Sequence, residues 1–179
     1  MRIFGVILAG GEGRRMGADK AFVPLAGRPL IAHVLDRLEP QVESVLISAN
    51  GDASRFAALG CRVVADAARQ GPLSGVLSAL QAAAGMGATH LVSTPVDKGM
   101  GREQVDGDDA TGDHPATAIW PVGLAPALAD FLAEGQAKVT RFTEAHHAAR
   151  ASFPDARAFL NLNTPEDLVA AEALLKGAA

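Results

Sequence analysis

The chain has 179 residues, of which 49% are hydrophobic and 20% are charged, and its net charge is −4 at pH 7. This length suits one well-buried domain, and the apolar content excludes a chain that is disordered over most of its length. The acidic balance argues against a general nucleic-acid-binding protein, which would carry an excess of Lys and Arg.

Cysteine content and apolar runs indicate the compartment. Cys61 is the only cysteine, so the chain forms no internal disulfide. No apolar run approaches the roughly 20 residues that a membrane span requires. The run over residues 3–9 is short and is followed by a glycine-rich stretch, which is not the pattern of a signal peptide. We therefore expect a cytoplasmic protein that does not associate with membranes.

Apolar strand patterns alternate with helical patterns along the first half of the chain. Such alternation is typical of a mostly parallel sheet covered by helices, and it predicts a three-layer α/β/α, Rossmann-like fold. The expected strands cover residues 3–9, 42–49, 62–65 and 90–94, and the expected helices cover residues 29–38, 54–59 and 73–84.

The second half begins with a segment of different character. Residues 98–113 contain four glycines and four aspartates without apolar periodicity, which predicts a mobile surface loop. Thr164, Pro165 and Asp167 have the spacing of a helix start, with Thr164 as N-cap and Asp167 in a capping-box position. The other expected elements are strands over 116–122 and 158–162 and helices over 125–133 and 139–149.

The loop Gly10–Lys20 follows the first strand and has the composition of a phosphate site. In parallel α/β sheets, ligands bind beyond the carboxyl ends of the strands. Glycines let backbone N–H groups approach anionic oxygens, and Arg14, Arg15 and Lys20 add positive charge. The loop therefore predicts a site for the triphosphate of a nucleotide.

Two common glycine-loop codes do not fit this stretch. The dinucleotide fingerprint G-x-G-x-x-G requires a third glycine where Met16 stands. The P-loop requires glycine before its lysine and Ser or Thr after it, whereas Lys20 lies between Asp19 and Ala21. The mismatch with the dinucleotide fingerprint disfavours a dehydrogenase-like module.

Polar residues also follow the other strands. Asn50, Asp66 and Asp97 stand at expected strand ends, although Asn50 could instead form a turn with the Gly-Asp pair that follows it. Asn161 and Asn163 alternate and so share one face of a strand, or else stabilise the turn before the last helix. His146 and His147 are adjacent on an expected helix, point about 100° apart and cannot chelate a metal together.

These motifs, taken in order, resemble those of the molybdenum cofactor guanylyltransferase (MobA) family of nucleotidyltransferases. The resemblance covers residues 3 to about 170 and implies the fold of nucleotide-diphospho-sugar transferases. It rests on Leu8–Gly11, Arg15–Gly17, Asp19–Lys20, Pro24–Leu30, Ile47–Asn50, Gly71–Gly75, Thr94–Asp97, His114–Pro115 and Asn161–Leu168.

The resemblance implies a Mg²⁺-dependent enzyme that transfers GMP from GTP to molybdenum-molybdopterin, releasing pyrophosphate. It implies one domain over residues 1–179, with a GTP- and Mg²⁺-binding half (1–97), a connecting loop (98–113) and a pterin-side half (114–179). The implied partners are cofactor-insertion or chaperone proteins and apo-molybdoenzymes, bound transiently, with no nucleic acid.

The resemblance also implies a role for individual residues. Arg15, Lys20 and Asp97 would be catalytic, with Asp97 also holding Mg²⁺. The residues around the substrates would be Leu8, Ala9 and Gly10 at the nucleotide, Gly11 and Gly13 at its phosphates, Asn50 and Asp66 at the nucleoside, Gly71, Pro72, Leu73 and Gly75 at the base, and Asn161 and Asn163 at the pterin.

One segment departs from the family pattern. The family has a Thr-Pro-Phe-like segment, a helix and a further strand between the metal aspartate and His-Pro, whereas here only the acidic loop separates Asp97 from His114. The chain is therefore expected to be shortened there. A cytidylyltransferase is the nearest alternative, which Gly71–Gly75 disfavours. A nucleotide-binding protein without catalysis is another alternative, which only the shortened segment supports.

Overall fold

A five-stranded sheet forms the centre of the computed structural model, which describes residues 1–10, 19–66, 70–97, 107–109, 112–152 and 162–177. The strand order is β5-β4-β1-β6-β9; the first four strands are parallel and β9 is antiparallel to β6. The predicted mostly parallel sheet is thus confirmed. The strands are β1 (Ile3–Leu8), β4 (Ser44–Ser48), β5 (Arg62–Val64), β6 (His90–Pro95) and β9 (Ala118–Pro121).

The strand order reverses beside β1. The chain runs from β1 to β4 and β5 on one side, and then returns through α2 (Pro72–Gly85) to β6 on the other side. Leu8, at the end of β1, pairs with Ser48 of β4 and with Pro95 of β6. The carboxyl ends of three strands therefore lie abreast at the point where α/β sheets bind ligands.

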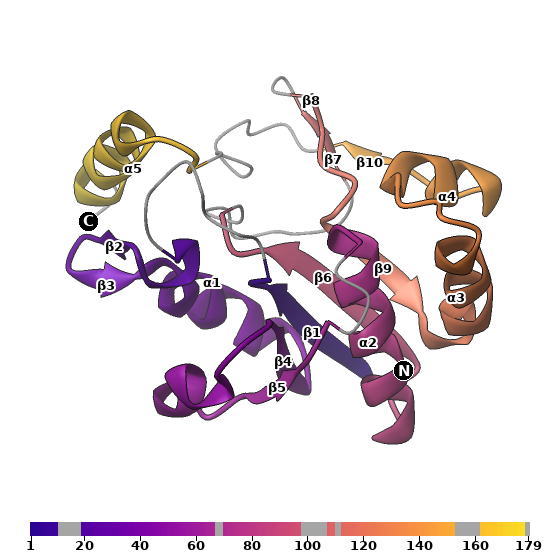
Figure 1. Ribbon diagram of the computed structural model, residues 1–179. Helices are drawn as coiled ribbons and strands as arrows, with labels where there is room; N and C mark the ends of the chain where they lie inside the picture. The colour runs from indigo at the N-terminus through magenta and orange to yellow at the C-terminus, as the bar shows by residue number, and fades with distance from the viewer. Residues whose placement is uncertain (11–18, 67–69, 98–106, 110–111, 153–161, 178–179) are drawn as a thin grey trace.

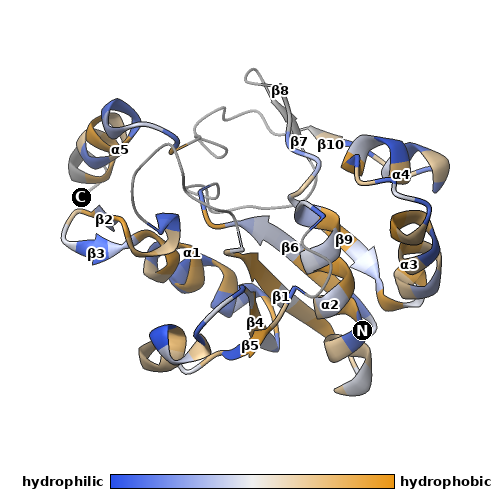
Figure 2. Ribbon diagram, in the orientation of Figure 1, coloured by the Kyte–Doolittle hydropathy of each residue, from blue (hydrophilic) through white to orange (hydrophobic). Residues whose placement is uncertain are grey.

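Helices cover both faces of the sheet (Figure 1). Ile7 and Ile47 face a core cluster shared with α1 (Leu30–Leu38), whereas Phe4, Val6 and Leu91 face a cluster shared with α2 and α3 (Ala125–Ala133). Figure 2 shows the hydrophobic strand β1 enclosed between these layers. This arrangement confirms the three-layer α/β/α prediction. No helix in the described part of the chain is long and apolar enough to cross a membrane.

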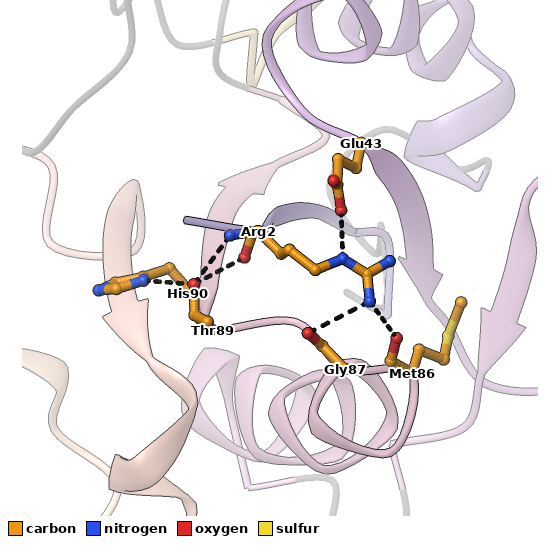
Figure 3. Close-up of polar contacts among 6 residues, drawn as sticks. All are labelled: Arg2, Glu43, Met86, Gly87, Thr89 and His90. Carbon is orange, nitrogen blue, oxygen red and sulfur yellow. Dashed lines mark hydrogen bonds and ion pairs between the residues drawn. The ribbon is translucent and has the colours of Figure 1, made fainter.

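A polar cluster joins the elements at the amino-terminal edge of the sheet (Figure 3). The Arg2 guanidinium donates to Glu43 Oε2 at 2.8 Å and to the carbonyl oxygen of Met86 at 3.1 Å. The Arg2 carbonyl accepts hydrogen bonds from the backbone N–H groups of Thr89 and His90. One side chain therefore ties the starts of β1 and β4 to the end of α2.

A small outer layer lies beside α1. The hairpin of β2 (Pro24–Leu25) and β3 (Arg28–Pro29) packs against α5 (Pro165–Gly177), as Figure 1 shows. Its turn places Ala26 at φ 49° and Gly27 at φ 77°, a pair of left-handed residues that suits a two-residue hairpin. The Ala26 N–H donates to Glu172 Oε1 of α5 at 2.9 Å.

Short elements complete the described chain. They are η1 (Lys20–Phe22), η2 (Glu39–Gln41), η3 (Ala53–Leu59), η4 (Val122–Leu124), α4 (Val139–Ala145), β7 (Gly107–Asp109), β8 (Gly112–Asp113) and β10 (Ala151–Ser152). The residues expected as a helix over 54–59 belong to the 3₁₀ helix η3, which begins one residue earlier.

Two predictions were wrong in part. The helix expected to extend to residue 149 ends at Ala145, because His146 leaves the helical conformation and His147 adopts φ 52°. Both histidines are exposed, as expected. The loop expected over 98–113 contains β7 and β8, which form a small sheet with β10. The strand expected over 158–162 lies outside the described residues except for Leu162, which is not in a strand.

Candidate active site

Lys20, Asp97 and Asn163 meet at the carboxyl edge of the sheet. The Lys20 ammonium donates to Asp97 Oδ2 at 2.5 Å and also to Asn163 Oδ1. The Lys20 and Asp97 side chains are 16% and 24% exposed, so both are shielded yet open to a ligand. Residues far apart in the chain thus bring a cation, an anion and an amide together at the predicted place.

Local structure positions Lys20 and Asp97. Lys20 is the first residue of η1, whose N-cap Asp19 accepts a hydrogen bond from the Ala21 N–H at 3.1 Å. Asp97 lies two residues beyond the end of β6, after Val96, whose N–H donates to the Leu8 carbonyl at 3.1 Å. That bond continues the pairing of β6 with β1 and so fixes the start of the segment that carries Asp97.

The turn before α5 positions Asn163. The Asp167 carboxylate accepts hydrogen bonds from the N–H groups of Asn163 at 2.8 Å and Thr164 at 2.9 Å. The Thr164 hydroxyl accepts in return from the Asp167 N–H at 3.2 Å, which confirms the predicted capping box. The two backbone bonds hold the pKa of Asp167 below its usual value. Asn163 thus belongs to the turn before α5, as one of the two interpretations predicted, and its side chain contacts Lys20. It does not lie in a strand, and Asn161 lies outside the described residues, so the role of the pair at the pterin stays a prediction.

The carbonyl oxygen of Asp97 joins this turn to the sheet. It accepts a hydrogen bond from the N–H of Leu162 at 3.1 Å, and the Leu162 side chain is buried against Leu25 and Leu30. The segment before α5 is therefore anchored to the end of β6 on one side and to the β2–β3 hairpin on the other.

A second group of predicted residues follows β4 and β5. Asp66 is 8% exposed, and its Oδ2 lies 2.8 Å from the hydroxyl of Ser74 in the first turn of α2. The same hydroxyl accepts from the Gln70 N–H at 3.0 Å and lies 2.9 Å from the carbonyl oxygen of Gly71. Ser74 thereby joins Asp66 to the start of α2. Sequence reasoning assigned it no role, although it lies inside the Gly71–Gly75 motif.

Gly75 allows the start of α2 to lie close to β4. A Cβ on Gly75 would lie 2.6 Å from Ser48 Oγ, whereas one on Gly10 would make an ordinary contact, 3.7 Å from Asn50 Nδ2. Gly71 adopts φ 79°, which favours glycine at the turn into α2. Leu73 is fully buried in the core, so its side chain does not line a surface.

Several predicted residues fall outside the described part of the chain. Gly11, Gly13, Arg15 and Asn161 belong to this group, so their roles stay predictions. Among the residues that the structure describes, no group of three or more His, Cys, Asp or Glu residues could hold a metal ion. Asp97 offers a single carboxylate, which suits Mg²⁺ because this ion takes one or two protein carboxylates and completes its shell with phosphate oxygens and water.

Comparisons with known proteins identify the family of this chain. The model of the MobA-like NTP transferase domain matches residues 5–150. A molybdenum cofactor guanylyltransferase from Cereibacter sphaeroides is 53% identical over 194 aligned positions, which cover 98% of each chain. One from Rhodobacter capsulatus is 44% identical over 190 positions, again covering 98% of each chain. Both alignments are longer than the 179-residue chain, so each relative has internal residues without a counterpart here.

Solved structures share the fold. Molybdopterin-guanine dinucleotide biosynthesis protein A from Archaeoglobus fulgidus superposes with a TM-score of 0.71 at 20% identity, over 97% of this chain and 99% of the other. CTP:phosphocholine cytidylyltransferase from Streptococcus pneumoniae superposes with a TM-score of 0.72 at 13% identity, over 98% of this chain and 100% of the other. Sequence and fold together show that the chain belongs to the MobA-like NTP transferase family.

Proposed function

We propose that the protein transfers GMP from GTP to the terminal phosphate of molybdenum-molybdopterin, forming molybdopterin guanine dinucleotide cofactor and pyrophosphate. The names of relatives that are 53% and 44% identical along nearly the whole chain support this activity. The observation that carries the proposal for this chain is the meeting of Lys20, Asp97 and Asn163 at the carboxyl edge of the sheet.

The reaction suits such a site. An oxygen of the acceptor phosphate attacks the α-phosphorus of GTP, the bond to the bridging oxygen of pyrophosphate breaks, and pyrophosphate carries the negative charge away. The acceptor phosphate is already ionised, so the site requires no strong general base. Its main tasks are to align two anions and to neutralise the charge that develops, which cationic side chains do without a covalent intermediate.

Lys20 carries the charge neutralisation among the described residues. Its ammonium donates to Asp97 and Asn163, and its third N–H would be left to donate to a phosphate oxygen. Arg15 of the preceding loop would add a second cation. Asp97 would hold Mg²⁺, which supplies further charge neutralisation and orients the phosphates when bound. Asn161 and Asn163 would orient the acceptor.

The group around Asp66 suits the nucleoside. Asp66 and Asn50 present polar atoms at the ends of adjacent strands, and the Ser74 hydroxyl fixes one oxygen of Asp66. Carboxylate acceptors match the N–H donors of guanine and the hydroxyls of ribose. Gly75 lies too close to Ser48 for a side chain, so the start of α2 packs directly on the end of β4, beside the expected nucleoside site. The product would pass transiently to cofactor-insertion or chaperone proteins and apo-molybdoenzymes.

Pyrophosphate release tests the proposal. The assay contains Mg²⁺ and molybdenum-loaded molybdopterin, and compares GTP with CTP and the native chain with Asp97→Ala. We expect release with GTP and a loss of about 100-fold or more in the variant, the scale on which removal of a group that stabilises transition-state charge acts. Omission of Mg²⁺ should abolish release by the native chain.

Each other outcome identifies an alternative. A preference for CTP would indicate a cytidylyltransferase. GTP binding without pyrophosphate release would indicate a nucleotide-binding protein that lacks catalysis, and would attribute the loss to the internal residues that the relatives have and this chain lacks. Full activity of Asp97→Ala would contradict the role of Asp97.

A further inference from the structure

Arg55 connects the Lys20 segment to the core. This side chain lies on η3, which follows β4, and its guanidinium forms an ion pair with the carboxylate of Asp19. The guanidinium carbon also lies 4.8 Å from the ring centre of Phe22 and 5.8 Å from that of Phe56. Arg55 therefore makes a charged contact and two cation–π contacts at once.

The residues that Arg55 touches belong to the functional segment and to its support. Asp19 is the N-cap of η1, and Phe22 is the last residue of that short helix, so Arg55 contacts both ends of η1. Phe56 is 1% exposed, and its ring centre lies 5.2 Å from that of Phe22. A continuous series of contacts thus runs from the buried Phe56 through η1 to the ammonium of Lys20.

The support of Arg55 is itself fixed. Asp52 caps η3 by accepting hydrogen bonds from the Ser54 N–H at 2.9 Å and from the Ser54 hydroxyl at 2.7 Å. Gly60 ends the helix at φ 67°. The backbone on either side of Arg55 is therefore held independently of Asp19.

We propose that Arg55 is a positioning residue for nucleotide binding: it holds Asp19–Phe22 so that the Lys20 ammonium lies beside Asp97 before GTP arrives. This inference rests on the proposed function. Arginine suits the role because its planar guanidinium can stack on rings while its edge donates to a carboxylate, which the ammonium of lysine cannot do together.

The contacts of Arg55 affect the affinity for GTP more than they affect the stability of the fold. Arg55 and Asp19 are 39% and 32% exposed, and an ion pair at such a position contributes little to global stability. A segment that is already ordered spares the nucleotide the entropic cost of ordering it. That cost falls equally on the bound substrate and on the transition state, so loss of Arg55 raises KM and leaves kcat nearly unchanged.

A double-mutant cycle tests the inference. The four proteins are the native chain, Arg55→Met, Asp19→Asn and the double variant, and Asn at position 19 still serves as an N-cap. We expect the Kd for GTP with Mg²⁺, measured by calorimetry, and the KM for GTP to rise about tenfold in Arg55→Met and by a smaller factor in Asp19→Asn, with kcat changed less than about twofold. The double variant should match Arg55→Met, because that substitution already removes the only contact that Asp19→Asn removes.

One further variant separates the contribution of the Arg55 charge from that of its stacking on the rings, and a control variant removes an exposed ion pair elsewhere. Arg55→Lys keeps the charge but loses the stacked plane, so its Kd should lie between those of the native chain and Arg55→Met. Arg2→Met is the control, because Arg2 forms an exposed ion pair with Glu43 at 2.8 Å at the amino-terminal edge of the sheet, and should leave Kd unchanged.

Unchanged GTP affinity in Arg55→Met, or additive effects in the double variant, would overturn the inference. A large fall in Tm with the native Kd would assign Arg55 a purely structural role and overturn it equally. If Arg55→Met does not fold, Arg55→Lys and Asp19→Asn provide the comparison. Failure of the proposed function is distinguishable, since the native chain would then release no pyrophosphate while the Kd values still report on Arg55.

Discussion

The carboxylate of Asp167 shows how one residue can serve both stability and the site. It accepts hydrogen bonds from the N–H groups of Asn163 and Thr164, which completes the capping box of α5. The same bonds fix the backbone of Asn163, whose side chain contacts Lys20. These bonds favour the ionised form, so the pKa of Asp167 is lower in the folded chain than its ordinary value of 3.8.

The depressed pKa of Asp167 makes its contribution to stability dependent on pH. For a carboxyl with a lowered folded pKa, the stabilisation is fully present above 3.8 and is lost as pH falls through the lower folded value. We expect Asp167→Asn to be less stable than the native chain at pH 7, and the difference in unfolding free energy to disappear under acid conditions below pH 3.8. Urea unfolding of both proteins at several pH values between 7 and the acid range measures this difference in unfolding free energy. A difference that is constant with pH would contradict the assignment.

Residue roles could be predicted from sequence where the contact is local. The capping box spans Thr164 to Asp167, so its spacing alone indicated the partners. The bond between Lys20 and Asn163 joins residues 143 positions apart, and no periodicity specifies which side chains will meet over that distance. The resemblance placed both residues near substrates, but their direct contact required the fold. Arg55 belongs to no motif, so its role could not be predicted from the sequence.

At the scale of elements, α2 packs closely on the strands through its first turn. Gly75 faces Ser48 of β4 and Leu8 of β1, whereas a Cβ on Gly85, at the other end of α2, would have no neighbour within 4 Å. A side chain at Gly75 would therefore displace Ser48 or the helix, and this is the turn that Ser74 joins to Asp66.

Two alanine substitutions in α2 test this asymmetry. Gly75→Ala should lower the unfolding free energy by about 1–3 kcal/mol, because the added methyl group overpacks a buried contact. Gly85→Ala should raise it by up to about 1 kcal/mol, because alanine is the better helix former at an open position. Thermal unfolding of both variants measures the effects, and equal shifts in Tm would contradict the packing described for Gly75.

Elements were predictable where their apolar pattern was long. The five strands of the main sheet and α1, α2, α3 and α5 lie close to their expected positions. The β2–β3 hairpin was missed because each strand has only two residues, too few for an alternating pattern, and Pro flanks the turn. β7 and β8 were missed because glycine and aspartate disfavour strands, although β7 pairs with both β8 and β10.

At the scale of the whole molecule, the two edges of the sheet have separate tasks. The carboxyl edge holds the Lys20 site, and the amino-terminal edge holds the Arg2 cluster of Figure 3. Gly87 follows the end of α2 at φ 83°, and the bonds from its N–H to Ala84 and from the Ala88 N–H to Ala83 complete a Schellman motif. Arg2 adds a cation beside the last carbonyls of the helix, where the dipole favours it.

Removal of Arg2 should therefore affect stability without affecting activity. Arg2→Met loses the helix-end contact and the exposed ion pair with Glu43, together worth about 1 kcal/mol. For a chain of this length the expected fall in Tm is about 2–4 °C. The KM for GTP should stay at the native value, since the cluster lies at the opposite edge of the sheet. A changed KM would show that the two edges are coupled.

The distance along the chain between Lys20 and Asn163 has a consequence for synthesis of the protein. The 143 positions that separate them take about 7–30 s to translate at ordinary rates of about 5–20 residues per second. During that time a nascent chain carries Lys20 and, later, Asp97, but not Asn163. The contact of Lys20 with both side chains therefore forms only late in synthesis, after the residues of α1, α2 and the main sheet have been made.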